Sequence, residues 1–239
     1  MNYKIIYNEE ALHYFIDNFL PNINDNTHTY YVSLLARNKY EVNTNVIKGD
    51  KAQVKRFNSS KERLFDKIKQ LEVPLGSYKT SDGNAIPQEA LALYIAPNPK
   101  CLRKAAFIAQ QELADSLYNG KFVNPRQVGM TAIHNAYDKF YFRDFDMDNV
   151  SADTVINDVS HLINHDAVHF LQTRGGVHVI VESAKVIGEY KKTWFKNIYN
   201  LPYTDKNASN PKKKTDKTLV DFTIPIVGCV QGGFVPRFI

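Results

Sequence analysis

Hydrophobic and polar positions along this chain predict helices and strands that alternate from one end to the other. Near the start, Leu12, Phe15, Ile16 and Phe19 recur at helical spacing, so they would share one side of a helix. In the first half we expect helices at residues 9–19, 59–71 and 100–118, and strands at 30–36, 41–47 and 90–95. Residues 125–139 are less regular, and their later part has helical spacing.

The second half has a different order of predicted elements. We expect strands at residues 140–145, 168–172, 177–181 and 219–224, helices at 152–164 and 185–199, and a lysine-rich loop at 201–218. The glycines of Arg174-Gly175-Gly176 separate two apolar runs, which is a hairpin signal. The order strand, helix, hairpin, helix, strand predicts an α+β fold with a small, mostly antiparallel sheet.

Composition narrows the class of protein. The 239 residues suit one globular domain or one domain with two parts, and 44% of them are hydrophobic. The two cysteines, Cys101 and Cys229, are far apart and have no metal-ligand spacing, so neither a disulfide framework nor a cysteine-rich zinc module is expected. The apolar runs are shorter than a membrane span, and the polar start is unlike a signal peptide. We therefore expect a cytoplasmic protein with no membrane partner.

The positive charge of the chain is concentrated in two zones. The formal net charge is only +5, but residues 48–69, which include Arg56, and residues 185–217, which include Lys212, Lys213 and Lys214, are rich in basic side chains. Such zones fit contact with a nucleic-acid backbone. A solvated lysine-rich surface is the alternative, and charge alone does not decide between them.

The segment Phe142-Arg143-Asp144-Phe145-Asp146-Met147-Asp148 contains the first candidate for chemistry. Alternate residues of a strand share a face, so Asp144 and Asp146 would project together. Two nearby carboxylates repel each other unless a cation lies between them, and hard divalent ions take such oxygen ligands. The alternative is a polar strand end whose acids are solvated and contribute little to packing.

The glycine turn and the strand after it contain the second candidate. Glycine lets the backbone approach a ligand closely, and Arg174 and His178 could donate hydrogen bonds to a phosphate. The alternative is a core histidine beside a tight turn. A third acid, Asp221, lies in the apolar run Leu219-Val220-Asp221-Phe222.

Together the DxD pair, the glycine turn that leads to GxH, and the later apolar residue followed by Asp resemble the three motifs of archaeo-eukaryotic primase and primase-polymerase catalytic domains. The resemblance covers residues 140–238, and it implies metal ligands at Asp144, Asp146 and Asp221, with Asp216 as another choice for the third acid. It implies triphosphate binding by His178, with Arg174 and Gly176 beside it. The family often has serine where this chain has Gly176, which would remove one hydroxyl from the phosphate site.

The resemblance also implies the architecture and the reaction. The fold would be a two-lobed primase-polymerase-like domain, with an N-terminal α/β lobe at residues 1–130 and an RRM-like catalytic lobe at 131–239. The activity would be template-dependent addition of nucleotides to a 3′-hydroxyl with Mg²⁺ or Mn²⁺. Its partners would be single-stranded or primed DNA and nucleoside triphosphates. No Walker A pattern occurs, so a helicase would be a separate protein.

Three alternatives remain open. A metal-dependent nuclease would also use clustered carboxylates, and a replication accessory protein could bind nucleic acid without catalysis. His161, His165 and His169 are spaced by four, so on a single helix they could bind zinc.

Overall fold

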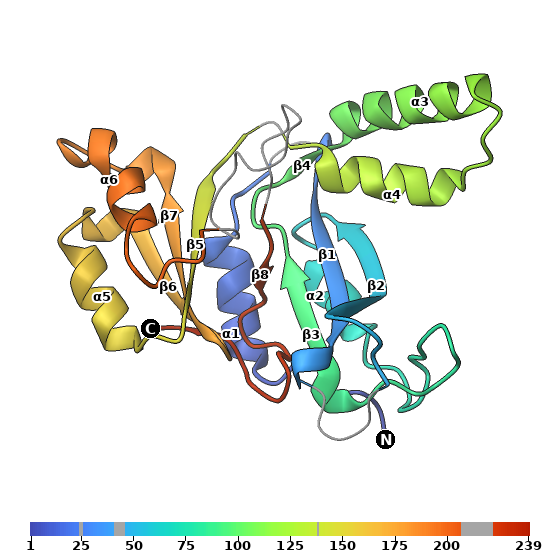
Figure 1. Cartoon of the computed structure of the whole chain (residues 1–239), viewed down its shortest axis with the longest axis horizontal. Helices are drawn as coiled ribbons and strands as arrows, with labels where there is room; N and C mark the ends of the chain where they lie inside the picture. The colour runs from blue at the N-terminus through green and yellow to red at the C-terminus, as the bar shows by residue number, and fades with distance from the viewer. Residues whose placement is uncertain (24–25, 41–45, 138, 207–221) are drawn as a thin grey trace.

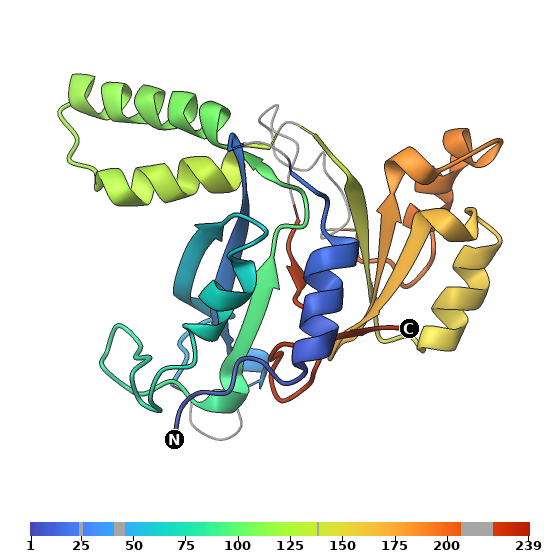
Figure 2. The ribbon, with the colours of Figure 1, turned by 180° about the vertical axis from the view of Figure 1, so that it is seen from behind.

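The computed structural model describes residues 1–23, 26–40, 46–137, 139–206 and 222–239. Over these residues the protein is a mixed α+β structure with two antiparallel sheets and six α-helices, which confirms the predicted fold class at that level. The two sheets stand apart in Figure 1, and helix α1 lies between them in both views (Figures 1 and 2).

The first sheet has the strand order β2-β1-β3-β8, and β4 pairs with the start of β1. Its strands are β1 (His28–Arg37), β2 (Lys51–Ser59), β3 (Leu91–Ile95), β4 (Lys100–Cys101) and β8 (Ile224–Pro225). Strand β3 is central and buried on both faces, and its apolar sequence LALYI suits that position. Strand β2 is an edge strand in which exposed Lys51, Gln53 and Lys55 alternate with partly buried residues. Such an edge of charged residues protects the sheet from pairing with other chains.

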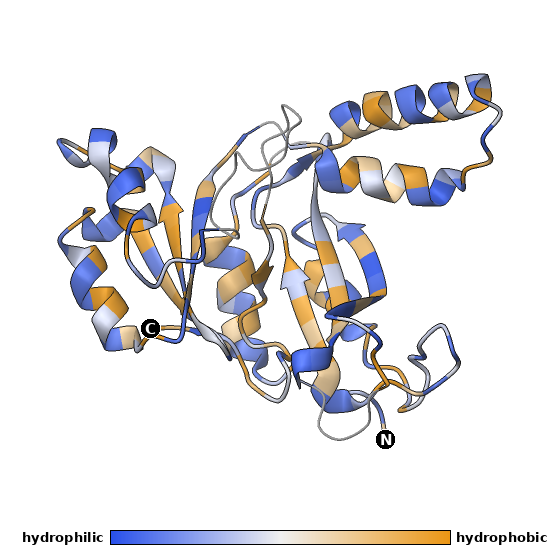
Figure 3. Cartoon of the chain, in the orientation of Figure 1, coloured by the Kyte–Doolittle hydropathy of each residue, from blue (hydrophilic) through white to orange (hydrophobic). Residues whose placement is uncertain are grey.

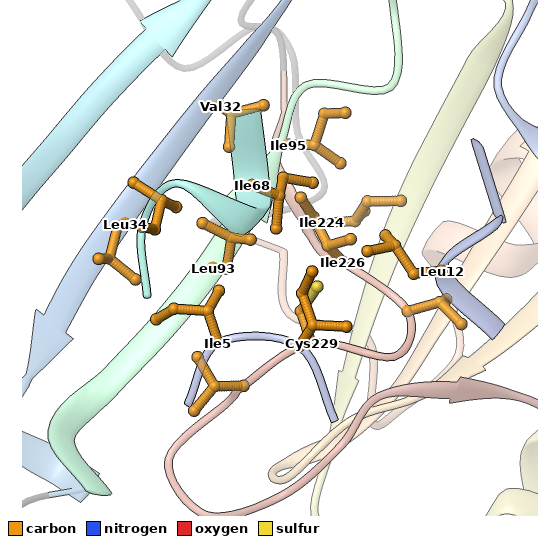
Figure 4. Close-up of a cluster of buried hydrophobic side chains, with 14 of the residues drawn as sticks. Ile5, Leu12, Val32, Leu34, Ile68, Leu93, Ile95, Ile224, Ile226 and Cys229 are labelled. Carbon is orange, nitrogen blue, oxygen red and sulfur yellow. The ribbon is translucent and has the colours of Figure 1, made fainter. Parts of the chain in front are cut away.

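Short helices cover one side of this sheet and close its core. Helix α1 (Glu9–Tyr14) is capped by the side chain of Asn8 and continues as a π-helix, η1 (Phe15–Phe19). The remaining ones on this side are α2 (Leu64–Lys69) and the 3₁₀ turn η3 (Gln88–Ala90). The 3₁₀ turn η2 (Asn38–Tyr40) packs on the other side, where Tyr40 contacts Ala92 and Tyr94 of β3. The core combines apolar side chains from α1, α2, strands of both sheets and the C-terminal segment, including Leu12, Ile68, Leu93, Ile226 and Cys229 (Figure 4).

Two helices form an arm that projects from the first sheet (Figures 1 and 2). They are α3 (Leu102–Tyr118), which follows β4, and α4 (Pro125–Asn135), which leads toward the second sheet. Their contact is built from small side chains, with Ala105, Ala132 and Ala136 buried and few larger residues around them.

The second sheet has the strand order β5-β7-β6-β9, and all its pairs are antiparallel. Its strands are β5 (Phe142–Asp148), β6 (Val168–Gln172), β7 (Gly176–Glu182) and β9 (Arg237–Phe238). The helical elements around it are α5 (Ala152–Ser160), α6 (Tyr190–Tyr199) and the 3₁₀ turns η4 (His165–Ala167) and η5 (Ser183–Lys185). The expected hairpin is confirmed, because β6 and β7 pair around the glycine turn.

The two faces of the second sheet have different partners. One face packs against α5 and α6 through a separate apolar cluster that includes Phe145, Val179 and Ile198. The other face meets α1 and η1, where the ring of Phe19 stacks on Phe142 at 4.6 Å between centroids. This second face is covered at the Phe142 end of β5, and the acids of β5 follow farther along the same face.

The C-terminal segment joins the two sheets. Ile224 and Pro225 pair with β3, the backbone N–H of Val230 donates to Ile5, and Phe238 pairs with Leu171. Gly228 is needed in this segment, because it has φ +78° and a Cβ there would lie 2.4 Å from the carbonyl oxygen of Asn8. The division of the chain into two lobes at residue 130 stays a prediction. The first sheet is not formed by residues 1–130 alone, because β8 comes from late in the chain.

Several predicted bounds need correction. Strand β2 was not expected, and the expected helix at residues 59–71 is shorter, since β2 ends at Ser59 and α2 runs only from Leu64 to Lys69. Of the expected strand at 41–47, residues 41–45 lie outside the described residues, as do residues 219–221 of the last expected strand. Most residues of β2 are polar or small, so the hydrophobic pattern did not predict this strand.

Candidate functional site

Strand β5 presents a row of carboxylates on one face. Its side chains alternate, so Asp144, Asp146 and Asp148 point to one side while Phe145 and Met147 are fully buried on the other. The buried pair anchors the strand against α5 and α6, and the register of β5 against β7 is set by that apolar face. Packing on one face therefore determines where the three acids project.

Histidine 178 lies beside this row of acids. It faces Asp146 directly across the β5–β7 ladder, and its neighbours Val177 and Val179 are buried on the opposite face, as the sequence pattern predicts. His178 Nδ1 lies 3.0 Å from both carboxylate oxygens of Asp144, and Nε2 lies 3.6 Å from Oδ1 of Asp146. The expectation that His178 and Asp144 share one side of the sheet is confirmed.

The histidine is both buried and charged. Only 8% of His178 is exposed, and the Asp144 side chain is exposed to the same small extent. Burial by itself lowers the pKa of His178, but the carboxylates of Asp144, Asp146 and Asp148 outweigh it and raise the pKa to about 9. His178 is therefore a cation at neutral pH, held by Asp144.

The geometry of Asp144 contradicts one alternative drawn from the sequence. The alternative to metal binding was a solvated acid that contributes little to packing, but the Asp144 side chain is buried against His178. Its two oxygens face the imidazole, so its first role in the structure is to hold a buried cation. Metal binding by Asp144 stays a prediction.

Three other carboxylates converge nearby. Oxygens of Asp146, Asp148 and Asp205 lie within 4.8 Å of one another, and among the described residues this group could hold a metal ion. Asp205 comes from the segment after α6, where its backbone N–H donates to the carbonyl oxygen of Asp146 at 2.7 Å. Thr204, its neighbour, forms a β-bridge with Met147. Backbone pairing along β5 therefore places Asp205 beside Asp146.

The donor set fits a hard divalent cation. All three ligands are carboxylates, which suit Mg²⁺ and Mn²⁺ rather than the softer metals that prefer thiolate or imidazole. Burial raises the pKa of Asp146, and the carboxylates of Asp144 and Asp205 raise it further although His178 opposes them. A cation among these acids would relieve their mutual repulsion.

Two expected acids cannot be placed. Asp221 and Asp216 lie outside the described residues, so their part in the site stays a prediction. Asp205, by contrast, was missed by sequence reasoning. It lies 57 positions after Asp148 in a polar loop with no motif around it, so nothing in the local sequence pointed to it.

The glycine turn lies against the acid end of β5. A Cβ on Gly176 would lie 2.0 Å from the carbonyl oxygen of Met147, so the backbone here leaves no room for any side chain. Glycine at this position is thus required by the close β5–β7 approach.

Arg174 points toward the first sheet. Its guanidinium lies 4.7 Å from the ring centroid of Tyr40 in η2 and donates to the carbonyl oxygen of Gly232. Its backbone N–H donates to the side chain of Gln231 at 2.9 Å. Arg174 thus ties the glycine turn to η2 and to the C-terminal segment.

A second cation reaches the acids from η2. Burial raises the pKa of both Asp146 and Asp148, and the positive charge of Lys39 opposes that rise without reversing it. Lys39 also lies 5.4 Å from the Tyr40 ring centroid. Sequence reasoning missed it, because more than a hundred residues separate Lys39 from β5 and only the fold brings them together.

Of the four residues expected to contact nucleic acid, the structure describes only Arg56. Arg56 lies on β2, opposite Ser33 of β1, in the first sheet and away from the acids. Lys212, Lys213 and Lys214 lie outside the described residues. The three histidines of the zinc alternative fall on different elements, with His161 capping α5, His165 in η4 and His169 in β6. The single-helix geometry that this alternative needs is therefore absent from the described residues.

Comparison with family models, with curated proteins and with solved structures finds no match. Among the described residues, no helix has both the length and the apolar sequence that crossing a membrane requires.

Proposed function

We propose that this chain is a template-dependent nucleotidyltransferase of the primase-polymerase type, which adds nucleotides to a nucleic-acid 3′-hydroxyl. The observation that carries the proposal is the clustering of Asp146, Asp148 and Asp205 beside the buried imidazole of His178. Carboxylates for a divalent ion and a cation for phosphate are the two requirements of this chemistry. The order of the three motifs in the sequence supports the same class.

Asp146, Asp148 and Asp205 are the residues that would hold Mg²⁺ or Mn²⁺. When bound there, such an ion lowers the pKa of the attacking hydroxyl and offsets the charge of the triphosphate. Asp221 stays the expected additional ligand.

His178 and Lys39 would position the incoming triphosphate. Asp144 holds His178 through Nδ1, so Nε2 remains directed toward the Asp146 side of the site. A protonated Nε2 can donate to a phosphate oxygen, and such charge-assisted bonds are stronger than neutral ones. Lys39 would add a second positive charge from η2.

The finer description of the fold is part of the same proposal. The small antiparallel sheet with α5 and α6 on one face and its acids on the other fits an RRM-like catalytic lobe. The first sheet would be the N-terminal lobe of a two-lobed primase-polymerase-like domain.

A nuclease and a non-catalytic accessory protein are the two competing functions. A nuclease needs the carboxylates but has no use for a cation dedicated to a triphosphate, so His178 and Lys39 favour nucleotide transfer. An accessory protein without catalysis would need neither the carboxylates nor these cations, so the cluster of Asp146, Asp148 and Asp205 argues against it.

The test is incubation with labelled nucleotides, Mg²⁺ or Mn²⁺, and either a primed or an unprimed single-stranded template. We expect elongation of the primer with the wild type and none with Asp146→Asn. Asp153→Asn, which changes an exposed acid on α5, is the matched control and should remain active. A labelled strand that is shortened instead of extended would establish the nuclease. Binding without either reaction would establish the accessory protein.

A further inference from the structure

The α3–α4 arm exposes large aromatic side chains that the proposed active site does not use. Phe107 is 61% exposed, Tyr118 is 92% exposed, and Phe122, in the turn between the helices, is 97% exposed. In Figures 1 and 2 the arm extends away from both sheets, with α3 on its outer side. Aromatic side chains left exposed on a projecting element are candidates for a binding surface.

The exposed residues of α3 form one stripe. Helix α3 packs against α4 through Ala105, Ala109 and neighbouring residues, so its opposite side faces solvent. Residues spaced by three or four share that outer side. They are Arg103, Phe107, Gln110, Gln111, Ala114, Leu117 and Tyr118, all of them exposed. Figure 3 shows orange and blue segments in turn along α3, so apolar and polar residues are interspersed along this helix.

The charge of the arm as a whole is positive. Residues 102–126 contain four basic side chains against two acids, and Asp115 lies at the edge of the stripe while helical spacing puts Glu112 on the α4 side. Lys121 lies in the turn at the tip, and Arg126 lies at the start of α4, which is capped by Asn124. The N-terminus of α4 adds partial positive charge at the same tip. The arm therefore combines exposed rings with cations and amide donors.

We propose that the outer face of α3 and the tip of the arm bind single-stranded nucleic acid. Unpaired bases would stack on Phe107, Tyr118 and Phe122, and Arg103, Lys121 and Arg126 would contact the phosphates. Rings with cations between them are the pattern of sequence-independent single-strand binding. The 17 residues of α3 span roughly 25 Å, long enough for several nucleotides.

The base of the arm is close to β5 along the chain. Helix α4 ends at Asn135, and Asp144 follows nine residues later. Asn98, next to the start of β4, accepts hydrogen bonds from the backbone N–H groups of Tyr141 and Phe142. A strand bound on the arm would thus lead toward the second sheet. The identity of the strand as template rests on the proposed function.

A second copy of the chain is the other occupant to test. A helical dimer face is expected to be a continuous aliphatic stripe at core spacing. In the arm, Leu117 is the one large aliphatic residue of the exposed stripe, and two glutamines and a basic residue share the stripe with it. The composition favours nucleic acid.

The first experiment measures binding of a fluorescent 20-nucleotide dT strand by anisotropy. We expect the variant carrying Phe107→Ser, Tyr118→Ser and Phe122→Ser to bind at least tenfold more weakly than the wild type. Tyr14→Ser, which removes an exposed ring from α1, should bind like the wild type. Equal affinity of the arm variant and the wild type would overturn the proposal.

The second experiment locates the contact in the unaltered protein. A dT strand containing 5-iododeoxyuridine is irradiated with the wild type, and the linked peptides are identified by mass spectrometry. Links to residues 102–126 support the proposal, and links confined to other segments overturn it. If the wild type is a dimer by light scattering and the arm variant is a monomer with unchanged strand affinity, the occupant is a second copy.

The outcomes separate this proposal from the proposed function. Asp146→Asn should lose nucleotide addition and keep strand binding, whereas the arm variant should regain nucleotide addition at saturating template. If the wild type adds no nucleotides but its strand binding is weakened by the arm substitutions, this inference stands and the polymerase proposal is rejected. If the wild type adds nucleotides and the arm substitutions leave strand binding unchanged, the polymerase proposal stands and this inference is rejected.

Discussion

His178 and Asp144 form a buried ion pair in which Nδ1 of the imidazole is 3.0 Å from each carboxylate oxygen. The pair joins two adjacent strands, β5 and β7, at the point where the face of the sheet changes from apolar packing to acids. His178 thus has two roles, because the imidazole proposed to contact the triphosphate also neutralises the buried carboxylate of Asp144.

The first prediction concerns the stability of that pair. His178→Ala leaves the Asp144 carboxylate buried without its cation, so the free energy of unfolding should fall by about 3 kcal/mol. Urea denaturation at pH 7 with chelator measures it. His161→Ala, at an exposed position after α5, is the control. The double variant His178→Ala with Asp144→Asn should lose less than the sum of the two single changes. Additive losses would contradict a direct pair.

The second prediction concerns metal binding. Asp205→Asn and Asp148→Asn should each weaken Mn²⁺ binding by about tenfold or more, since each removes one of three clustered carboxylates. Electron paramagnetic resonance of free Mn²⁺ gives the affinity without any need for activity. Asp166→Asn, an exposed acid in η4, should leave it unchanged. Unaltered affinity in Asp205→Asn would remove this residue from the site.

The third prediction concerns Lys39. If its charge attracts the triphosphate, Lys39→Ala should raise the KM for nucleotide by about tenfold with a smaller effect on kcat. Steady-state kinetics of primer extension measures the change, and Lys79→Ala, at an exposed position away from η2, serves as the matched variant. A fall in kcat with unchanged KM would mean that Lys39 acts in the chemical step and not in binding.

The fourth prediction concerns pH and Glu72, far from the candidate site. Its Oε1 accepts the backbone N–H groups of Ile5 and Ile6, both at 3.0 Å, and Oε2 lies 3.1 Å from Lys69. Burial by itself raises the pKa of Glu72, but these hydrogen bonds and the Lys69 ammonium outweigh it, so the pKa is lowered from 4.5. The ionised form is therefore the one that the fold stabilises.

The sign of the pH effect follows from that direction. The contribution of Glu72 is fully present above pH 4.5 and is lost as the pH falls through the lower pKa of the folded protein. The stability difference between the wild type and Glu72→Gln should therefore shrink as the pH is lowered from 6 to about 3. Thermal denaturation over this range measures it, with Glu10→Gln as the exposed control. A difference that grows toward acid pH would contradict the assignment.

The fifth prediction concerns Lys212, Lys213 and Lys214. If they contact phosphates, binding of single-stranded DNA should weaken steeply with salt, and replacing all three with alanine should reduce the slope of log K against log salt by about 2. Anisotropy titrations at several salt concentrations give the slope. A slope unchanged by the substitutions would mean that these lysines do not touch the strand.

The local pattern was sufficient to predict much of the second sheet. Strand β6 has the bounds expected at residues 168–172, because a glycine turn and two apolar runs specify a hairpin from local information alone. The same alternation placed His178 on the side of Asp144, opposite Val177 and Val179. Each of these inferences needs only neighbouring residues and the two-residue period of a strand.

The site was predicted less completely, because much of it comes from distant segments. Lys39 is brought near the acids by the packing of η2, and Asp205 by the bridge between Thr204 and Met147. Neither residue lies in a recognisable sequence motif. Strand β2 was missed for a related reason. As an edge strand it carries lysines and a glutamine where a central strand would have apolar residues, so hydrophobic periodicity could not identify it.

The late return of the chain to the first sheet also affects how the protein can be made. Strand β3 pairs with Ile224 and Pro225, and Val230 bonds to Ile5, so the first sheet draws on residues synthesised more than a hundred positions after β3. On the ribosome, an N-terminal fragment would expose the apolar surface that Ile226 and Cys229 finally cover. Both sheets can close only once residues 224–238 have left the exit tunnel. Folding of these two sheets should therefore wait for the synthesis of residues 224–238, and a nascent chain that stalls before residue 224 becomes a substrate for chaperones.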